Sequence, residues 1–186
     1  MKIIGVIGKN GSGKDEVLKY LCDRYDVPFL STGDIVRGIA ASEGKEPTRP
    51  NLQAISDRHF KERGEGCFVK MVIDKIREKG WKIAGISGVR SPKDVAILRK
   101  ELGLNFVLMY VYVTDSHVRF ERMLKRGEGR DAKAYDQFVQ QDKAEEKLFN
   151  IEKAAAKADY SLSNDGSLGD LRIAIDNLVT DDRLLE

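Results

Sequence analysis

A glycine-rich loop between a short apolar run and a helical pattern constrains the fold more than any other segment. Residues 8–15 read Gly-Lys-Asn-Gly-Ser-Gly-Lys-Asp, which follows the phosphate-binding pattern G-x-x-x-x-G-K-[ST] except at its last position. The run at residues 3–7 is typical of a buried parallel strand, and apolar residues after the loop recur at helical spacing. A strand, a glycine loop and a helix N-terminus in this order are what a polyphosphate site requires.

Each loop residue has a predicted place beside a bound nucleotide. The glycines let the chain turn tightly enough to aim its backbone N–H groups inward, and Lys14 is expected to meet the β and γ phosphates. The predicted ATP contacts in the loop are Gly8, Lys9, Asn10, Gly11, Ser12, Gly13, Lys14 and Asp15. An ordinary glycine-rich turn is the alternative, and the strand and helix patterns on either side argue against it.

Length and composition exclude several classes of protein. A chain of 186 residues suits one domain, 1–186, with a substantial core. Its 32 basic and 30 acidic residues nearly cancel, so no general attraction to nucleic acid or to a membrane surface is expected. Two cysteines are too few for a disulfide framework. Because no signal peptide or long apolar span is visible, the sequence predicts a cytoplasmic protein, of unspecified oligomeric state.

Alternating strand and helix patterns follow the loop and predict a parallel α/β sheet. The strands are expected at residues 3–7, 27–30, 81–87, 106–113 and 160–163. Helices are expected over most of 52–79, after the Ser91-Pro92 start, and over 116–126, 134–157 and 168–178. Parallel strands place their ligand-binding loops at the carboxyl edge of the sheet. Arg37 and Arg90 follow the second and third strands, so they are predicted to hold a second anion beside the first.

The motifs at these strand ends resemble adenylate kinase and its relatives in the P-loop nucleoside monophosphate kinase superfamily. Residues 31–37, STGDIVR, resemble the stretch after strand two in that family, and residues 88–90 resemble its strand-three motif. Arg122 and Arg126 resemble arginines of the lid, and residues 164–166 resemble the loop that borders the adenine. The likeness is closest to small adenylate-kinase-related and dephospho-coenzyme-A-kinase-like proteins.

This resemblance implies a fold and a set of site residues. The fold is a three-layer α/β/α domain with a five-stranded parallel sheet in the order 2-3-1-4-5, an acceptor-binding helical region at about 34–79 and a lid region at about 119–146. The implied catalytic residues are Lys14, Arg122 and Arg126, and Asn164, Asp165 and Gly166 are implied as further ATP contacts. The implied acceptor contacts are Thr32, Gly33, Asp34, Arg37 and Arg90, with Arg49 and Gln53 open between an acceptor contact and a structural role.

Two departures from the family pattern concern the metal. Asp15 stands where the loop usually has Ser or Thr, and Ser87 stands where strand three usually ends in Asp. Our hypothesis is that the two groups have exchanged places around one Mg²⁺, which takes oxygen ligands of either kind. A carboxylate beside a polyphosphate is repulsive unless a cation lies between them, so nucleotide binding should depend strongly on Mg²⁺.

A third departure lies in the lid. Gln141 stands where the related segment often carries an arginine before the acid at Asp142, so one phosphate clamp is missing. Arg130 is a candidate to compensate, and a solvated surface charge is the alternative for it. Arg119 is open between a phosphate contact and a helix-face charge.

Together these features predict an enzyme that transfers the γ-phosphoryl group of Mg·ATP to a small phosphorylated acceptor, with a nucleoside or deoxynucleoside monophosphate favoured. A dephospho-coenzyme-A-kinase-like enzyme is the enzymatic alternative, and its hydroxyl acceptor would need a base such as Asp34. A nucleotide-binding regulator with weak ATPase activity is the alternative from another class. The predicted second phosphate site argues against this alternative, because a protein that only binds ATP does not need one.

Overall fold

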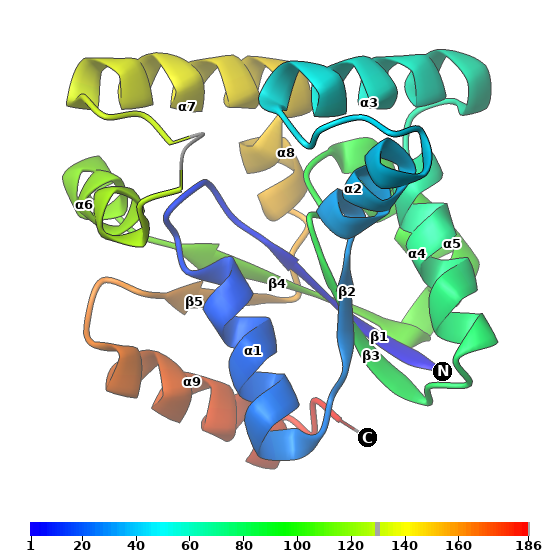
Figure 1. The fold of residues 1–186 in the computed structure, drawn as a ribbon. Coiled ribbons are helices and arrows are strands. Elements are labelled where there is room, and N and C mark those ends of the chain that lie inside the picture. The colour runs from blue at the N-terminus through cyan, green and yellow to red at the C-terminus, as the bar shows by residue number, and fades with distance from the viewer. Residues whose placement is uncertain (129–130, 186) are drawn as a thin grey trace.

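The computed structural model describes residues 1–128 and 131–185, and at position 49 the backbone alone. In this part of the chain five parallel strands form one sheet in the order β2-β3-β1-β4-β5 (Figure 1). The strands are β1 (Lys2–Ile7), β2 (Phe29–Ser31), β3 (Ile83–Ser87), β4 (Phe106–Tyr112) and β5 (Tyr160–Ser163). The predicted fold class and strand order are therefore confirmed.

Helices cover both faces of the sheet and its carboxyl edge (Figure 1). On one face lie α1 (Lys14–Tyr25) and α9 (Leu168–Thr180), and on the other lie α4 (Cys67–Glu78), α5 (Pro92–Leu102) and α8 (Ile151–Ala155). Around the carboxyl edge lie α2 (Thr32–Ser42), α3 (Arg49–Arg63), α6 (Ser116–Arg126) and α7 (Tyr135–Phe149), and a short 3-10 turn, η1 (Gly103–Asn105), precedes β4. The predicted acceptor region thus consists of α2, α3 and α4, and the predicted lid lies around α6 and α7.

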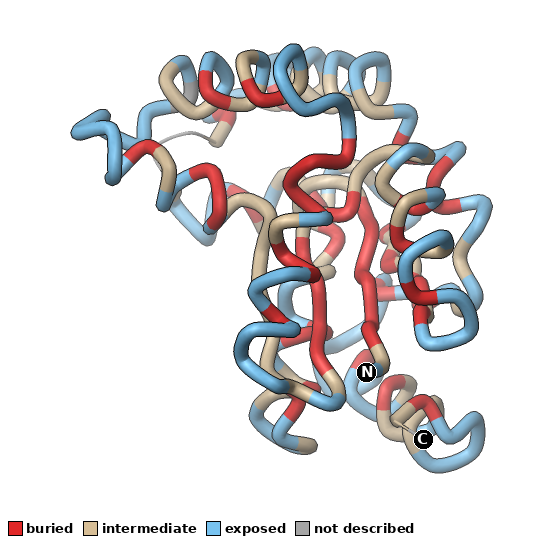
Figure 2. Tube along the Cα trace, turned by 90° about the vertical axis from the view of Figure 1, so that its right-hand side faces the viewer, coloured by how far each residue is buried: buried red, intermediate tan, exposed pale blue. Residues whose placement is uncertain are grey.

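The central strand β1 shows why the sheet is stable. Ile3 and Ile7 face the α4, α5 and α8 side, whereas Ile4 and Val6 face α1 and α9, and all four are fully buried. Figure 2 shows buried segments of the chain, in red, at the centre of the molecule. A parallel strand buried on both faces reads as a continuous apolar run, as this one does. Burial of such side chains stabilises the fold by about 1.5–3 kcal/mol each, and it fixes the strand that delivers the glycine loop.

Several element boundaries differ from the predicted ones by a few residues, and three differences concern the second strand and two of the helices. The second strand begins at Phe29 rather than at residue 27, because Pro28 has no N–H to donate, although its carbonyl accepts from Gly85 at 2.8 Å. The helix predicted over 134–157 breaks at Asn150, which has a φ of 52° and ends α7 before α8. The helix predicted over 52–79 is interrupted at residues 64–66, between α3 and α4.

Among the described residues, none of the helices combines the length and apolar character that a membrane crossing requires.

Candidate functional site

The glycine loop connects the end of β1 to the start of α1 at the carboxyl edge of the sheet. Gly11 has a φ of 78° and Gly13 a φ of 89°, a left-handed backbone that L side chains rarely adopt. Gly13 is also the N-cap of α1, and no side chain caps this helix end. The first N–H groups of α1 are therefore available to an anion, and the positive end of the helix dipole favours one there.

Lys14 stands at the start of α1 with little exposure to solvent, its side chain being 15% exposed. Burial lowers the pKa of Lys14, and the carboxylate of Asp15, with its Oδ2 4.0 Å from Lys14 Nζ, opposes that effect. In the described residues Asp15 is the only ion-pair partner of this buried ammonium group, and at 4.0 Å it neutralises the charge poorly. An anion bound at the loop would supply the missing charge.

Asp15 and Ser87 meet across the site, as the metal hypothesis requires. The hydroxyl of Ser87, at the end of β3, donates to Asp15 Oδ1 at 2.5 Å. Within the described residues no group of three or more His, Cys, Asp or Glu side chains is arranged to hold a metal. Mg²⁺ is commonly held by one or two protein oxygens together with phosphate and water oxygens, so these two side chains fit it.

On the predicted acceptor side, Thr32 and Gly88 hold β2 and β3 together where the strands end. The Thr32 hydroxyl donates to the Gly88 carbonyl at 3.1 Å. Gly33 lies in the first turn of α2, and its N–H donates to the capping hydroxyl of Ser31 at 3.1 Å. The loop after β3 is thus fixed against the start of α2.

The two acceptor-side arginines differ in their surroundings. Arg37 forms an ion pair with Asp34, one turn earlier on α2. Arg90 instead lies over the ring of Phe149 at 5.3 Å, and no ion pair of its guanidinium is found within residues 1–128 and 131–185. After burial and Asp15, Arg90 is the next influence on the pKa of Lys14, which it lowers. Arg90 therefore adds positive charge close to the loop.

The arginines of α6 also differ from each other. Arg122 donates from Nη2 to the Asn164 carbonyl at 2.9 Å, and its buried Nη1 has no partner in the part of the chain described. Arg126 is held by Asp131 at 2.8 Å and by Glu128 at 3.2 Å. Among the described residues Arg122 therefore has a donor without a partner, whereas Arg126 is paired with carboxylates of the predicted lid region.

The loop after β5 supports its neighbours through its side chains. Asn164, 6% exposed, donates from Nδ2 to the Ser12 carbonyl at 2.8 Å. Asp165 accepts from the hydroxyl of Ser163 at 2.7 Å and from the N–H and hydroxyl of Thr114 at 2.7 and 2.9 Å, which together lower the pKa of Asp165. Gly166 follows beside Asp170, the capping-box residue of α9. The Asn164 side chain therefore contacts the glycine loop itself.

Sequence reasoning missed the contacts that α7 and α8 make with the same loop. Lys9 Nζ lies 2.5 Å from Glu152 Oε1, and Asn10 Nδ2 donates to Glu145 Oε2 at 2.8 Å. Arg119 bonds both carboxylate oxygens of Asp142 at 2.8 Å. These partners are more than twenty residues apart in the chain, and the pattern of one sequence carries no signal for such pairs.

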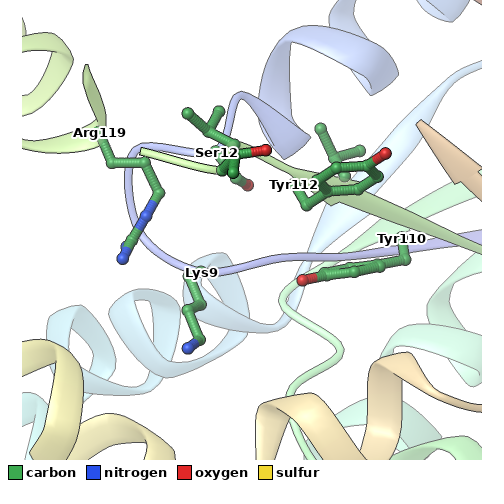
Figure 3. Close-up of a pocket in the computed structure, with 8 residues that line it drawn as sticks. Lys9, Ser12, Tyr110, Tyr112 and Arg119 are labelled. Atoms are coloured by element: carbon green, nitrogen blue, oxygen red, sulfur yellow. The ribbon is translucent and has the colours of Figure 1, made fainter. Parts of the chain in front are cut away.

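A cavity of about 130 Å³ lies beside the loop, on the side of β4 (Figure 3). Its lining is largely polar and includes Lys9, Ser12, Tyr110, Tyr112 and Arg119. The Ser12 hydroxyl is buried without a partner among the described residues. Burial raises the pKa of Tyr110, and the charge of Lys9 opposes that rise.

Three further candidates from the sequence are not placed at the site by the described residues. Arg130 and the side chain of Arg49 lie outside the described residues. Gln53 donates to Asp57 Oδ1 at 2.8 Å, along its own helix.

The chain is similar to known proteins over most of its length. A protein-family profile described as an AAA domain matches residues 7–138. A UPF0200 protein of Thermococcus onnurineus is 35% identical over 165 residues, which cover 88% of this chain and 88% of the relative. A UPF0200 protein of Pyrococcus horikoshii is 34% identical over 180 residues, which cover 96% of each chain.

Solved structures with the same fold include small-molecule kinases. Shikimate kinase from Acinetobacter baumannii, in complex with shikimate, superposes with a TM-score of 0.61 at 19% identity, covering 99% of this chain and 96% of that one. A gluconokinase from Sinorhizobium meliloti superposes with a TM-score of 0.55 at 17% identity, covering 100% and 97%. The chain therefore belongs to the UPF0200 family, and its domain has the fold of the small P-loop kinases.

Proposed function

We propose that this protein is an ATP-dependent phosphotransferase that moves the γ-phosphoryl group to a small phosphorylated acceptor, a nucleoside or deoxynucleoside monophosphate. The observation that carries the proposal is the cationic pair formed by Lys14 and Arg90. Both lie at the carboxyl edge, Lys14 at the loop and Arg90 after β3, and the charge of one depresses the pKa of the other. In the described part of the chain neither cation has a close neutralising partner, so the pair suits two phosphate groups brought together.

In this proposal the chain contributes mainly positioning and charge. The loop amides and Lys14 stabilise the γ-phosphoryl group as negative charge spreads over its oxygens. Arg90 holds the acceptor phosphate, and Arg122 contributes its unpartnered Nη1 from the α6 side. No general base is needed, because the attacking atom of a phosphorylated acceptor is already an ionised oxygen.

Asp15 and Ser87 are the residues proposed to hold Mg²⁺. When bound, Mg²⁺ supplies neutralisation of the charge on the β and γ phosphates. The Ser87 hydroxyl orients the Asp15 carboxylate through their 2.5 Å hydrogen bond. The carboxylate also favours the protonated form of Lys14, since it raises the pKa that burial lowers.

The Asp34–Arg37 ion pair favours a second candidate function, transfer to a hydroxyl acceptor. While this pair persists, the Arg37 guanidinium is engaged and Asp34 is an acid at the acceptor side able to accept a hydroxyl proton. The known kinases with this fold include a shikimate kinase crystallised with shikimate and a gluconokinase. A dephospho-coenzyme A acceptor belongs to the same candidate class.

One assay separates the candidates. Mg²⁺-dependent ADP formation from ATP is measured with a panel of nucleoside monophosphates, deoxynucleoside monophosphates, dephospho-coenzyme A and small polyols. Turnover with a monophosphate that is lost in Arg90→Ala and retained in Asp34→Asn supports the first candidate. Turnover with a hydroxyl acceptor that is lost in Asp34→Asn supports the second. Tight ATP binding without acceptor-dependent turnover would overturn both and leave a nucleotide-binding regulator.

A further inference from the structure

Arg119 has an environment unlike that of a phosphate-binding arginine. It is only 6% exposed, and its guanidinium forms a two-pronged bond with Asp142, with both nitrogen–oxygen distances at 2.8 Å. The same guanidinium lies over the Phe138 ring at 5.0 Å. A buried, bidentate arginine–carboxylate pair is geometrically specific and already neutralised. A phosphate would have to displace Asp142 to reach it.

The remaining contact of Arg119 is with the backbone of the glycine loop. Its Nη1 donates to the Asn10 carbonyl at 3.0 Å. Because the peptide unit is planar and trans, the carbonyl of Asn10 and the N–H of Gly11 point in opposite directions. Holding that carbonyl toward α6 therefore turns the Gly11 N–H away from α6, toward the inside of the loop.

A second side chain does the same two peptide units further on. Asn164 donates to the Ser12 carbonyl at 2.8 Å, which fixes the direction of the Gly13 N–H in the same way. Within the described part of the chain, neither the Gly11 nor the Gly13 N–H has a hydrogen-bond partner. Two loop amides are thus oriented from outside and left open for a ligand.

We propose that Arg119, held by Asp142, is a positioning residue that sets the direction of the Gly11 amide for polyphosphate binding. Asn164 is its counterpart for the Gly13 amide. The inference rests on the proposed nucleotide site and adds to it the origin of the loop's preorganisation. The inference also gives α7 a role, because Asp142 on this helix holds Arg119 in place and so orients the loop without contacting the phosphate.

The chain offers a matched control at the opposite edge of the sheet. Arg99 bonds both oxygens of Asp159 at 2.7 Å, donates to the Phe106 carbonyl at 2.9 Å and lies over the Phe106 ring at 5.1 Å. The chemistry resembles that of Arg119, although a single nitrogen, Nη2, bonds both oxygens and each side chain of the pair is 36% exposed. The carbonyl held is at the start of β4. Arg99→Lys and Asp159→Asn therefore remove the same kind of contact far from the loop.

The test compares Arg119→Lys and Asp142→Asn with those two controls, after circular dichroism has shown which variants fold. The first readout, on protein without nucleotide, is the amide chemical shift and hydrogen-exchange rate of Gly11. The second is the Kd of Mg·ATP together with KM for the acceptor. We expect a changed Gly11 signal and a roughly tenfold weaker Kd in both loop-side variants, an unchanged acceptor KM, and less than a twofold change in the controls.

Two results would overturn the inference: a folded Asp142→Asn protein with the wild-type Gly11 signal, or an equal loss of ATP affinity in the controls. Asp142→Asn preserves the shape of the side chain, so its Gly11 signal and Kd of Mg·ATP test the inference even if Arg119→Lys does not fold. A double variant that costs no more than either single change identifies the two residues as one unit. If wild-type protein binds no ATP, the proposed function fails, whereas the Gly11 readout still decides whether Arg119 positions the loop.

Discussion

Replacing Asp15 by threonine tests the unusual end of the glycine loop most directly. Asp15→Thr restores the residue type that this pattern usually has and removes the only carboxylate that lies near Lys14 in the described ion pairs. It also removes the partner of the Ser87 hydroxyl. We expect metal-free ATP to bind the variant more tightly than wild type, because repulsion between the carboxylate and the polyphosphate is gone.

The structure sets the size of this effect. Asp15 Oδ2 lies 4.0 Å from Lys14 Nζ, a separation at which two unit charges interact by about 4 kcal/mol at an effective dielectric constant of about 20. The Asp15 side chain is 58% exposed, so solvent screening reduces this to about 1 kcal/mol. A phosphate held by Lys14 meets the same carboxylate and carries more than one charge. We therefore expect metal-free affinity to rise about tenfold, or about 1.4 kcal/mol.

The assay is calorimetric titration of ATP in the presence of a chelator and again with excess Mg²⁺. Glu16→Thr is the matched control, because Glu16 is also acidic, lies in the same first turn of α1 and is the next residue along the chain. The difference between the two conditions should shrink in Asp15→Thr and stay at its wild-type value in Glu16→Thr. Equal metal-free ATP affinity in Asp15→Thr and wild type would refute the reasoning. If Glu16→Thr gained as much metal-free affinity as Asp15→Thr, the effect would be one of net charge and not of the position of Asp15.

Three further predictions concern pH and backbone geometry. Burial lowers the pKa of Lys14, and Asp15 opposes this effect. In Asp15→Thr, Lys14 should therefore lose its proton at a lower pH than in wild type, and ATP affinity should begin to fall at that lower pH. ATP titrations between pH 7 and 10 measure this. Gly88→Ala places a methyl group at a φ of 86° and against Thr32 Oγ1. It should lower the free energy of unfolding in urea by about 3 kcal/mol and raise KM for the acceptor. The control Gly44→Ala, at a φ of 66° with open space around it, should lower the free energy of unfolding by about 1 kcal/mol. Arg58 and Lys45 lower the pKa of Glu43 to about 2, so the stability that this group contributes is complete above pH 4.5 and is lost as the pH falls toward 2; Glu43→Gln should flatten that part of the unfolding profile.

The fold was predictable because the strand and helix patterns of this chain are regular. The strand at 160–163 and the helix at 116–126 have their predicted limits, and the loop between β1 and α1 stands where the glycine pattern places it. That Asp15 and Ser87 lie close together was also expected from sequence, since parallel strands bring their carboxyl ends together, whereas their direct hydrogen bond was not. These features depend on local periodicity and on one topological rule.

The rest of the site depends on pairings that no local pattern contains. Arg37 lies one turn from Asp34 on α2, so helix geometry pairs the two, but the helix start at Thr32 was not predicted. Asn164 reaches a loop carbonyl that is 152 residues earlier in the sequence. An isolated arginine such as Arg119 looks the same in sequence whether it meets a phosphate, solvent or a buried carboxylate. Only the packing of α7 distinguishes these cases.

The carboxylates around the loop determine which cations remain for a nucleotide. Lys9 is paired with Glu152 and Arg119 with Asp142. Within the described residues the only ion pair of Lys14 is the 4.0 Å contact to Asp15. A triphosphate carries more negative charge than one lysine can neutralise, and Asp15 adds to that excess. Positive charge from outside the loop is therefore needed to neutralise the triphosphate, from Arg90, Arg122 and a divalent cation. Loss of the divalent cation should therefore weaken ATP binding more than loss of any single arginine.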